Sequence, residues 1–279
     1  MRWTVRAAFA CALVAACGAP KTTTTTTGLR IVSLVPSVTE IVYALGAEQA
    51  LVGNTNQCDY PEAAKQVAKV GDFMQPDMER IVALRPTLVF VTLPTHRAII
   101  EKLGELKIPT YVSRPKDIAA VFAEIESVGT IVGKRPKADS LVAAMRTRLD
   151  ALPQALDTPR VFVEISSSPL MTAGSGTFIN ELVARAGGRN VFANALQEYP
   201  VIDGEAVLAR NPDVILLLHP DVTTGEVSSR VGWQKLNAVR AGRVYGGLDE
   251  DLLFRPGPRI VDGVELLYKV MHGEHGGND

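Results

Sequence analysis

Few side chains in this sequence could carry out catalysis or hold a metal ion. The 279 residues include three cysteines and four histidines, and His96 and His219 each follow an apolar run. Nucleophilic catalysis needs a serine or cysteine beside a histidine base and an orienting acid, but no Gly-x-Ser-x-Gly turn follows a predicted strand. We therefore expect no enzyme activity, no cofactor and no metal site. Metal coordination by His96, His219 or Cys58 stays a secondary hypothesis.

Groups suited to binding a small molecule follow the apolar runs that predict β-strands. In parallel sheets, ligands bind at the carboxyl ends of strands, where loops and helix N-termini gather. The candidate ligand-binding residues at such positions are Ser37, Gln57, Cys58, Phe73, Thr92, His96, Met171, Ser175, Tyr199, Asp251, Phe254 and Arg255. This mixture of aromatic, amide, hydroxyl and charged groups favours a large amphipathic organic ligand.

The elements that must position these residues alternate between strand and helix patterns. Short apolar runs at 30–35, 87–92, 161–165 and 214–218 alternate with helical patterns, which is typical of βα units. Between residues 116 and 156, apolar residues recur at spacings of three and four, as in long helices. We therefore predict an α/β fold: two Rossmann-like lobes with mainly parallel sheets, joined by one long backbone helix, with a ligand cleft between the lobes.

The predicted domain boundaries follow these changes of pattern. We expect an N-terminal lobe over 29–133, a connecting backbone helix over 134–157, a C-terminal lobe over 158–273 and a polar tail over 274–279. Near the start of the first lobe, Ser37 and Glu40 have the spacing of a capping box, which predicts a helix beginning at residue 38.

A short pattern occurs once in each predicted lobe. Asp77 and Glu79 in the first copy align without a gap with Asp203 and Glu205 in the second, and each copy continues to a proline and an apolar strand. Aspartate is a favoured helix N-cap, and a proline disfavours helix at the residue before it. The repeat indicates two related lobes.

The N-terminal residues predict export and lipid attachment. Arg2 and Arg6 precede an apolar run that is too short to span a bilayer, which favours a signal peptide over residues 1–16. The run ends in Val-Ala-Ala-Cys at Cys17, which resembles the lipobox of bacterial lipoproteins. Residues 17–28 would then form a lipidated, threonine-rich tether. The predicted location is extracytoplasmic (periplasmic or cell surface), with the chain anchored to a membrane by lipid.

The net charge argues against one class of ligand, and the cysteine content argues against disulfide bonds. The formal net charge of −1 argues against nucleic-acid binding, which needs a concentrated basic surface. Cys11 lies in the predicted signal peptide and Cys17 would carry lipid, so only Cys58 would remain and no intramolecular disulfide could form. We expect a monomer.

Four stretches of the sequence carry a resemblance to a known family. They are RIVSLVPSVTEIVYALG (30–46), LVGNTNQCDYP (51–61), VGDFMQPDMERIVALRPTLVF (70–90) and LFRPGPRIVDG (253–263). In this order they resemble the vitamin B12-binding proteins of ABC importers, within the superfamily of helical-backbone (class III) substrate-binding proteins. The resemblance implies a protein that captures cobalamin or a related corrinoid and delivers it to a permease.

The resemblance also implies roles for individual cleft residues. Phe73, Tyr199, Asp251 and Arg255 match positions that contact corrinoid in the family. The two aromatic rings would stack on the macrocycle or its base, and the charged pair would bind peripheral amides.

Four further positions can be compared with the family: two glutamates match it, and two cleft residues differ from it. Glu79 and Glu205 match the acids that pair with arginines of the dimeric ABC permease, so that permease is the expected partner. Gln57 stands where the family has a tyrosine, and Thr92 stands where it has a tryptophan. Haem, ferric siderophores and metals therefore remain alternative ligands, and a ligand-binding receptor without a permease is a further alternative.

Overall fold

The computed structural model describes residues 28–154 and 156–273. The predicted signal peptide, the lipidation site Cys17, the tether up to residue 27 and the polar tail lie outside the described residues. Within the described ranges, no helix is long and apolar enough to cross a membrane.

The first lobe is a four-stranded parallel sheet with short helices around it. Its strand order is β2-β1-β3-β4, and every neighbouring pair is parallel. The strands are β1 (Ile31–Ser33), β2 (Leu51–Asn54), β3 (Leu88–Thr92) and β4 (Thr110–Ser113), and the helices are α1 (Pro36–Ala44), α2 (Met78–Ala83) and α3 (Arg97–Glu105).

The second lobe is a mainly parallel sheet of order β6-β5-β8-β9, with β7 also paired to β5. Only the β5–β6 pairing is antiparallel among the described strands. The strands are β5 (Arg160–Ser167), β6 (Leu170–Thr172), β7 (Arg189–Asn190), β8 (Val214–Leu217) and β9 (Val244–Tyr245). The helices are α6 (Phe178–Arg185), α7 (Gly204–Arg210), α8 (Thr224–Ser229), α9 (Asn237–Arg240), α10 (Glu250–Phe254) and α11 (Ile260–His272).

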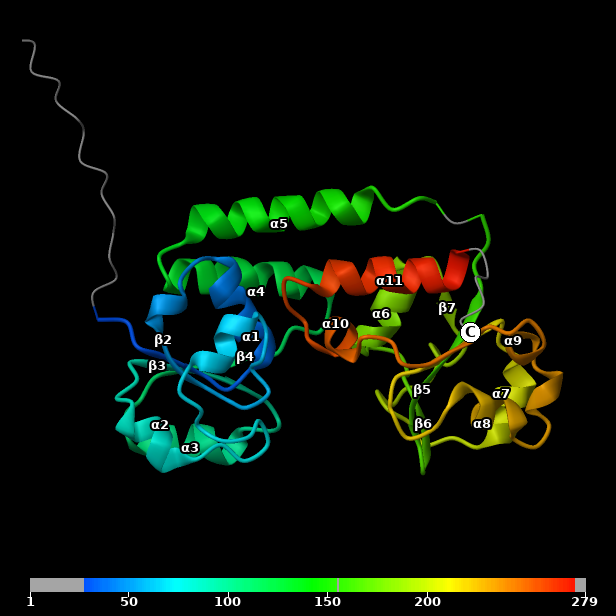
Figure 1. The fold of residues 1–279 in the computed structure, drawn as a ribbon, viewed down its shortest axis with the longest axis horizontal. Coiled ribbons are helices and arrows are strands. Elements are labelled where there is room, and N and C mark those ends of the chain that lie inside the picture. The colour runs from blue at the N-terminus through cyan, green and yellow to red at the C-terminus, as the bar shows by residue number, and fades with distance from the viewer. Residues whose placement is uncertain (1–27, 155, 274–279) are drawn as a thin grey trace, which may run out of the picture.

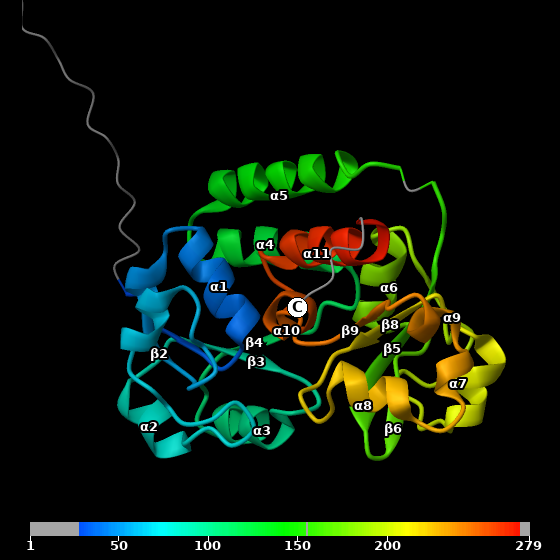
Figure 2. The same ribbon diagram turned by 45° about the vertical axis from the view of Figure 1, so that its right-hand side comes forward.

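Two helices lie between the lobes in the sequence. They are α4 (Ile118–Ile131) and α5 (Arg135–Asp150), and α5 falls within the range predicted for the connecting helix. At 1.5 Å per residue, the 16 residues of α5 extend roughly 24 Å. Figures 1 and 2 show α5 running along one side of the molecule above α4 and α11, so the chain crosses from lobe to lobe there.

Alternate side chains of the strands pack into different cores. Ile31 and Phe90 face a cluster that continues through α4 and α5 to Val161 and Val163 of the second lobe. Val89, which precedes Phe90 in β3, faces a separate cluster under α2 and α3. This period-two alternation is the pattern of a strand buried on both faces. Because one core is shared by the two lobes and the connecting helices, any hinge motion between the lobes would disturb packed side chains.

The predicted capping box at Ser37 is wrong. Helix α1 begins at Pro36, and its N-cap Val35 makes no side-chain capping bond. Proline is well suited to the first helical turn, since it lacks the N–H that would need a partner there. Ser37 is buried, and the Glu40 carboxylate binds two arginines from the C-terminal part of the chain instead.

Candidate ligand-binding site

A pocket of about 430 Å³ lies where the strand ends of the first lobe meet the α10 segment. In Figures 1 and 2, α10 lies in the space between the two lobes. The predicted residues that line this pocket are Ser37, Gln57, Phe73, Thr92, Asp251, Phe254 and Arg255. The α10 segment, which follows β9 of the second lobe, contributes Asp251, Phe254 and Arg255 to this pocket.

Phe73 is held in place by hydrogen bonds to its backbone. Its N–H donates to Gln57 Oε1 at 2.8 Å, and its carbonyl lies 2.7 Å from His96 Nε2. His96 Nδ1 accepts the Thr92 N–H at 3.0 Å, which assigns the ring proton to Nε2 and makes Nε2 the donor to Phe73. The two rings also meet edge to face at 5.0 Å between centroids. The pocket therefore presents a pre-positioned aromatic ring.

His96 supports the pocket from behind and does not line it. Its side chain is fully buried, and this burial lowers its pKa, so that the ring stays neutral near pH 7. Both ring nitrogens are already occupied by backbone groups. His96 therefore does not line the pocket in this structure, because a helix-start position after a buried strand can face inward as well as outward. Ligand contact by His96 stays a prediction.

Cys58 is also buried beneath the pocket wall, with 1% of its surface exposed. Its sulfur lies 3.2 Å from the hydroxyl groups of Thr39 and Thr55. A thiol in such surroundings acts as a packed side chain, and ligand contact by Cys58 stays a prediction.

An ion-pair network closes one side of the pocket. Arg255 pairs with Asp59 at 2.7 Å and with Asp251 at 2.9 Å, and Arg259 donates to both carboxylate oxygens of Glu40 at 2.8 and 2.6 Å. The Glu40 side chain is only 2% exposed. A buried carboxylate is tolerated when it is paired and hydrogen-bonded, and Arg259 meets that requirement in bidentate geometry. The network joins α1 of the first lobe to α10 and α11.

The network explains why Asp59 keeps its charge. Burial alone would raise the pKa of Asp59, but the hydrogen bond and positive charge of Arg255 outweigh it and hold that pKa below its usual value. Arg259 also stacks over the Tyr60 ring at 3.9 Å. The pairing of Glu40 with Arg259 was not predicted from the sequence. The available signal was a charged residue within the otherwise apolar face of α1.

Three of the six predicted contacts from the second lobe do not line this pocket. Met171 lies on β6 beside Val201, and the Ser175 hydroxyl donates to the Ala195 carbonyl at 2.6 Å. Tyr199 is 42% exposed in the loop before α7. Ser175 therefore stabilises a turn, whereas Met171 and Tyr199 could reach a ligand only if it extended beyond the pocket of the first lobe.

The histidine considered for metal binding in the second lobe is already paired. His219 Nε2 lies 3.1 Å from Glu164 Oε1, and Arg230 binds the same carboxylate at 2.6 and 2.7 Å. Over residues 28–154 and 156–273, no group of three or more His, Cys, Asp or Glu side chains is arranged to hold a metal ion. The secondary hypothesis of metal coordination gains no support from this arrangement.

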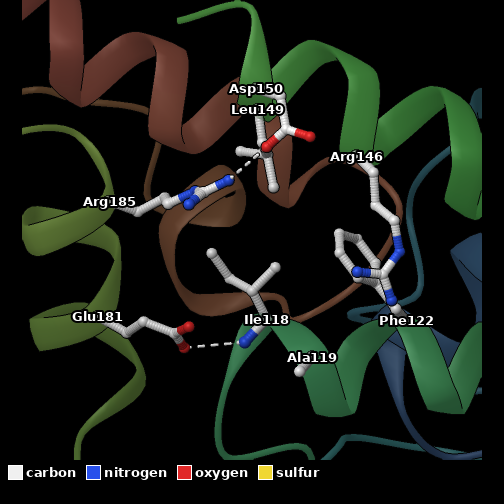
Figure 3. Close-up of a pocket in the computed structure, with 8 residues that line it drawn as sticks. All are labelled: Ile118, Ala119, Phe122, Arg146, Leu149, Asp150, Glu181 and Arg185. Carbon is white, nitrogen blue, oxygen red and sulfur yellow. Dashed lines mark hydrogen bonds and ion pairs between the residues drawn. The ribbon is translucent and has the colours of Figure 1, made fainter. Parts of the chain in front are cut away.

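A second hollow, of about 240 Å³, lies between α4, α5 and α6 (Figure 3). There the Glu181 carboxylate of α6 accepts the Ile118 N–H at 2.8 Å, and Arg185 pairs with Asp150 at 3.0 Å. Glu181 thus caps the N-terminus of α4 from the other lobe. Helices rather than strand-end loops form its walls, so this hollow is a polar junction between the lobes.

The repeated pattern places two glutamates in equivalent positions. Asp77 accepts the Glu79 N–H at 2.9 Å, and Asp203 accepts the Ala206 N–H at 2.7 Å, so each aspartate caps its short helix. Glu79 and Glu205 follow in the first turns of α2 and α7 and are exposed. Neither takes part in an ion pair with another described residue. Two exposed carboxylates thus lie at matching sites, one on each lobe.

Comparisons with known proteins agree with this architecture. The family described as periplasmic binding protein matches residues 31–250. An uncharacterized ABC transporter substrate-binding lipoprotein of Bacillus subtilis, YvrC, is 36% identical over 87% of this chain and 80% of its own length. The vitamin B12-binding protein of Vibrio parahaemolyticus is 30% identical, over 84% of this chain and 86% of its own length.

Solved structures of proteins that are named for different ligands share this two-lobed fold. The periplasmic vitamin B12-binding protein BtuF of Vibrio cholerae superposes with a TM-score of 0.69 at 28% identity, covering 87% of this chain and 96% of that one. The periplasmic heme-binding protein RhuT of Roseiflexus sp. RS-1 gives a TM-score of 0.75 at 25% identity, covering 87% and 98%. The predicted α/β fold and the predicted resemblance are both confirmed, and the chain belongs to the periplasmic binding protein family.

Proposed function

We propose that this protein captures a corrinoid, cobalamin or a close relative, outside the cytoplasm and delivers it to the permease of an ABC importer. The observation that carries the proposal is the pocket at the strand ends of the first lobe. Phe73 and Phe254 offer aromatic surface there, and Asp251 and Arg255 offer an acceptor and a donor at its edge. A macrocycle with peripheral amides needs this combination of an apolar face and polar rim. Two relatives named for vitamin B12 support this ligand.

Haem is the second candidate ligand, because a haem-binding protein has the same fold at comparable similarity. Absorbance and calorimetric titrations of the purified protein with cyanocobalamin, haemin and a ferric siderophore distinguish the candidates. We expect saturable one-to-one binding of cyanocobalamin. Binding of haemin or siderophore with none for any corrinoid would refute the corrinoid and leave the solute-binding function in place.

Removing the Phe73 ring should weaken corrinoid binding. Phe73→Ala deletes the one aromatic face in the pocket whose position is fixed by hydrogen bonds to Gln57 and His96. We expect at least about fivefold weaker binding of cyanocobalamin, since aromatic stacking contributes about 1 kcal/mol beyond burial alone. Phe73→Tyr keeps the ring and should bind within about twofold of the wild type. Equal affinity of the alanine variant would show that the ligand lies elsewhere.

Glu79 and Glu205 are the proposed contacts with the permease dimer. They lie at equivalent positions on α2 and α7, and a two-fold partner can engage both at once. An apolar groove lined by Val82 and Leu106 adjoins Glu79 and would add buried surface to the contact. Lipid attachment at Cys17 would keep the monomeric protein near that partner.

Charge reversal of both glutamates should abolish transport without affecting capture. We expect Glu79→Lys/Glu205→Lys to reduce corrinoid uptake by at least tenfold, because two like charges would face the arginines of the partner. Its affinity for cyanocobalamin should stay unchanged. Glu48→Lys, a reversal at an exposed residue in the turn before β2, serves as the control and should transport normally. Normal uptake by the double variant would favour a receptor that works without this permease contact.

A further inference from the structure

The charged side chains of the pocket are not equivalent. Three charged residues line it: Arg114, Asp251 and Arg255. Asp251 and Arg255 pair with each other at 2.9 Å, and Arg255 also binds Asp59 and Glu40. Arg114 is exposed and makes no ion pair with any residue of the described chain. One lining guanidinium is thus left for an anionic group on the ligand.

The backbone fixes where this guanidinium begins. β4 ends at Ser113, which lies beside Thr92 in the parallel register of β3 and β4, so Arg114 leaves the sheet at its carboxyl edge. Pro115 follows, and a residue before proline is restricted to an extended conformation. Ser113 is 2% exposed and anchors the strand end. The start of the Arg114 side chain is therefore rigid, while its end is free to meet a ligand.

We propose that Arg114 binds the phosphate group of a complete corrinoid and so distinguishes cobalamin from phosphate-free corrinoids. The inference rests on the corrinoid function proposed above and adds a subsite to the same pocket. Cobalamin carries one phosphodiester in its nucleotide loop, whereas cobinamide lacks the loop. A guanidinium donates two parallel hydrogen bonds to a phosphate, which a lysine cannot do. Asp251, 45% exposed at the side chain, would repel a second anion.

The test compares two ligands and three variants by calorimetric titration of the purified protein. Cyanocobalamin contains the phosphate and dicyanocobinamide does not. For Arg114→Gln we expect roughly 10- to 100-fold weaker binding of cyanocobalamin, the range for losing a hydrogen bond to a charged group, and a change below about twofold for dicyanocobinamide. Arg114→Lys should recover part of the lost affinity. Arg97→Gln, a matched exposed arginine on α3, should change neither.

Salt provides a second measurement of the same contact. Raising the ionic strength should weaken cyanocobalamin binding by the wild type more than by Arg114→Gln, because an exposed charge pair is screened. Equal losses for the two ligands, or no loss for either, would overturn the phosphate subsite while leaving the corrinoid function intact. If the wild type bound neither ligand, the corrinoid function itself would fail, and the subsite would fail with it.

Discussion

Glu40→Ala should destabilise the protein by about 3–5 kcal/mol, the usual cost of removing one partner from a buried ion pair. The Glu40 side chain is 2% exposed and Arg259 is 15% exposed, so the change would leave the Arg259 charge without its carboxylate partner and with little access to water, while Arg255 would keep Asp59 and Asp251. The loss should appear in urea or thermal unfolding as a lower midpoint. Because the network also fixes α10 against the first lobe, ligand affinity should fall as well.

A matched pair of variants separates this network from ordinary surface charges. Glu62→Ala removes a carboxylate that is 81% exposed and pairs with Lys65, and its unfolding midpoint should barely move. Glu40→Ala combined with Arg259→Leu should be less damaging than the sum of the two single variants, because the uncompensated charge is gone. A Glu40→Ala protein that unfolds like the wild type would show that α1 and the α10–α11 segment are not held together by these ion pairs.

Glu124→Gln should stabilise the protein at pH 8 and change little at pH 4. Glu124 lies on α4 with 6% of its surface exposed, and one carboxylate oxygen has no hydrogen-bond partner among the described residues. Burial raises its pKa from 4.5 to about 7, against the lowering effect of a hydrogen bond with Ser113. The carboxyl group is therefore neutral in the folded protein at a pH where the unfolded chain has already ionised.

The direction of this pH dependence follows from whether the folded or the unfolded state holds the Glu124 proton more tightly. Below pH 4.5 Glu124 is protonated in both states, so its raised pKa does not change the folding stability. Between pH 4.5 and about 7 the unfolded state loses its proton first, and folding stability falls. The total loss is on the order of 3 kcal/mol. Glutamine cannot ionise, so the stability difference between variant and wild type should grow by that amount from pH 4 to pH 8. A difference that stays constant with pH would contradict a buried neutral Glu124.

Sequence patterns predicted the fold because its causes are local. The alternation seen at Val89 and Phe90, and the spacing of apolar residues in α4 and α5, arise from neighbouring positions in the chain. The repeated N-cap aspartates were found for the same reason, since a cap and its helix lie within three residues.

The parts of the site that were missed depend on contacts between distant residues. Glu40 and Arg259 are 219 positions apart, so no local pattern could pair them, and the capping box was predicted in their place. His96 and Cys58 stand at strand ends, as a pocket residue would, but whether such a side chain turns toward the ligand or the core depends on tertiary packing. Phe73 and Asp251 also follow predicted strands, and the resemblance to a family supplied the long-range information that placed them in one cleft.

The pocket itself can be tested by locating the ligand. A crystal structure of the protein soaked with cyanocobalamin, with anomalous data collected at the cobalt edge, gives the metal position without reference to the fold. We predict one cobalt peak in the pocket between the first lobe and α10, with the corrin plane against the ring of Phe73. A peak on any other surface, or no peak at a ligand concentration that saturates binding in solution, would contradict the site described here.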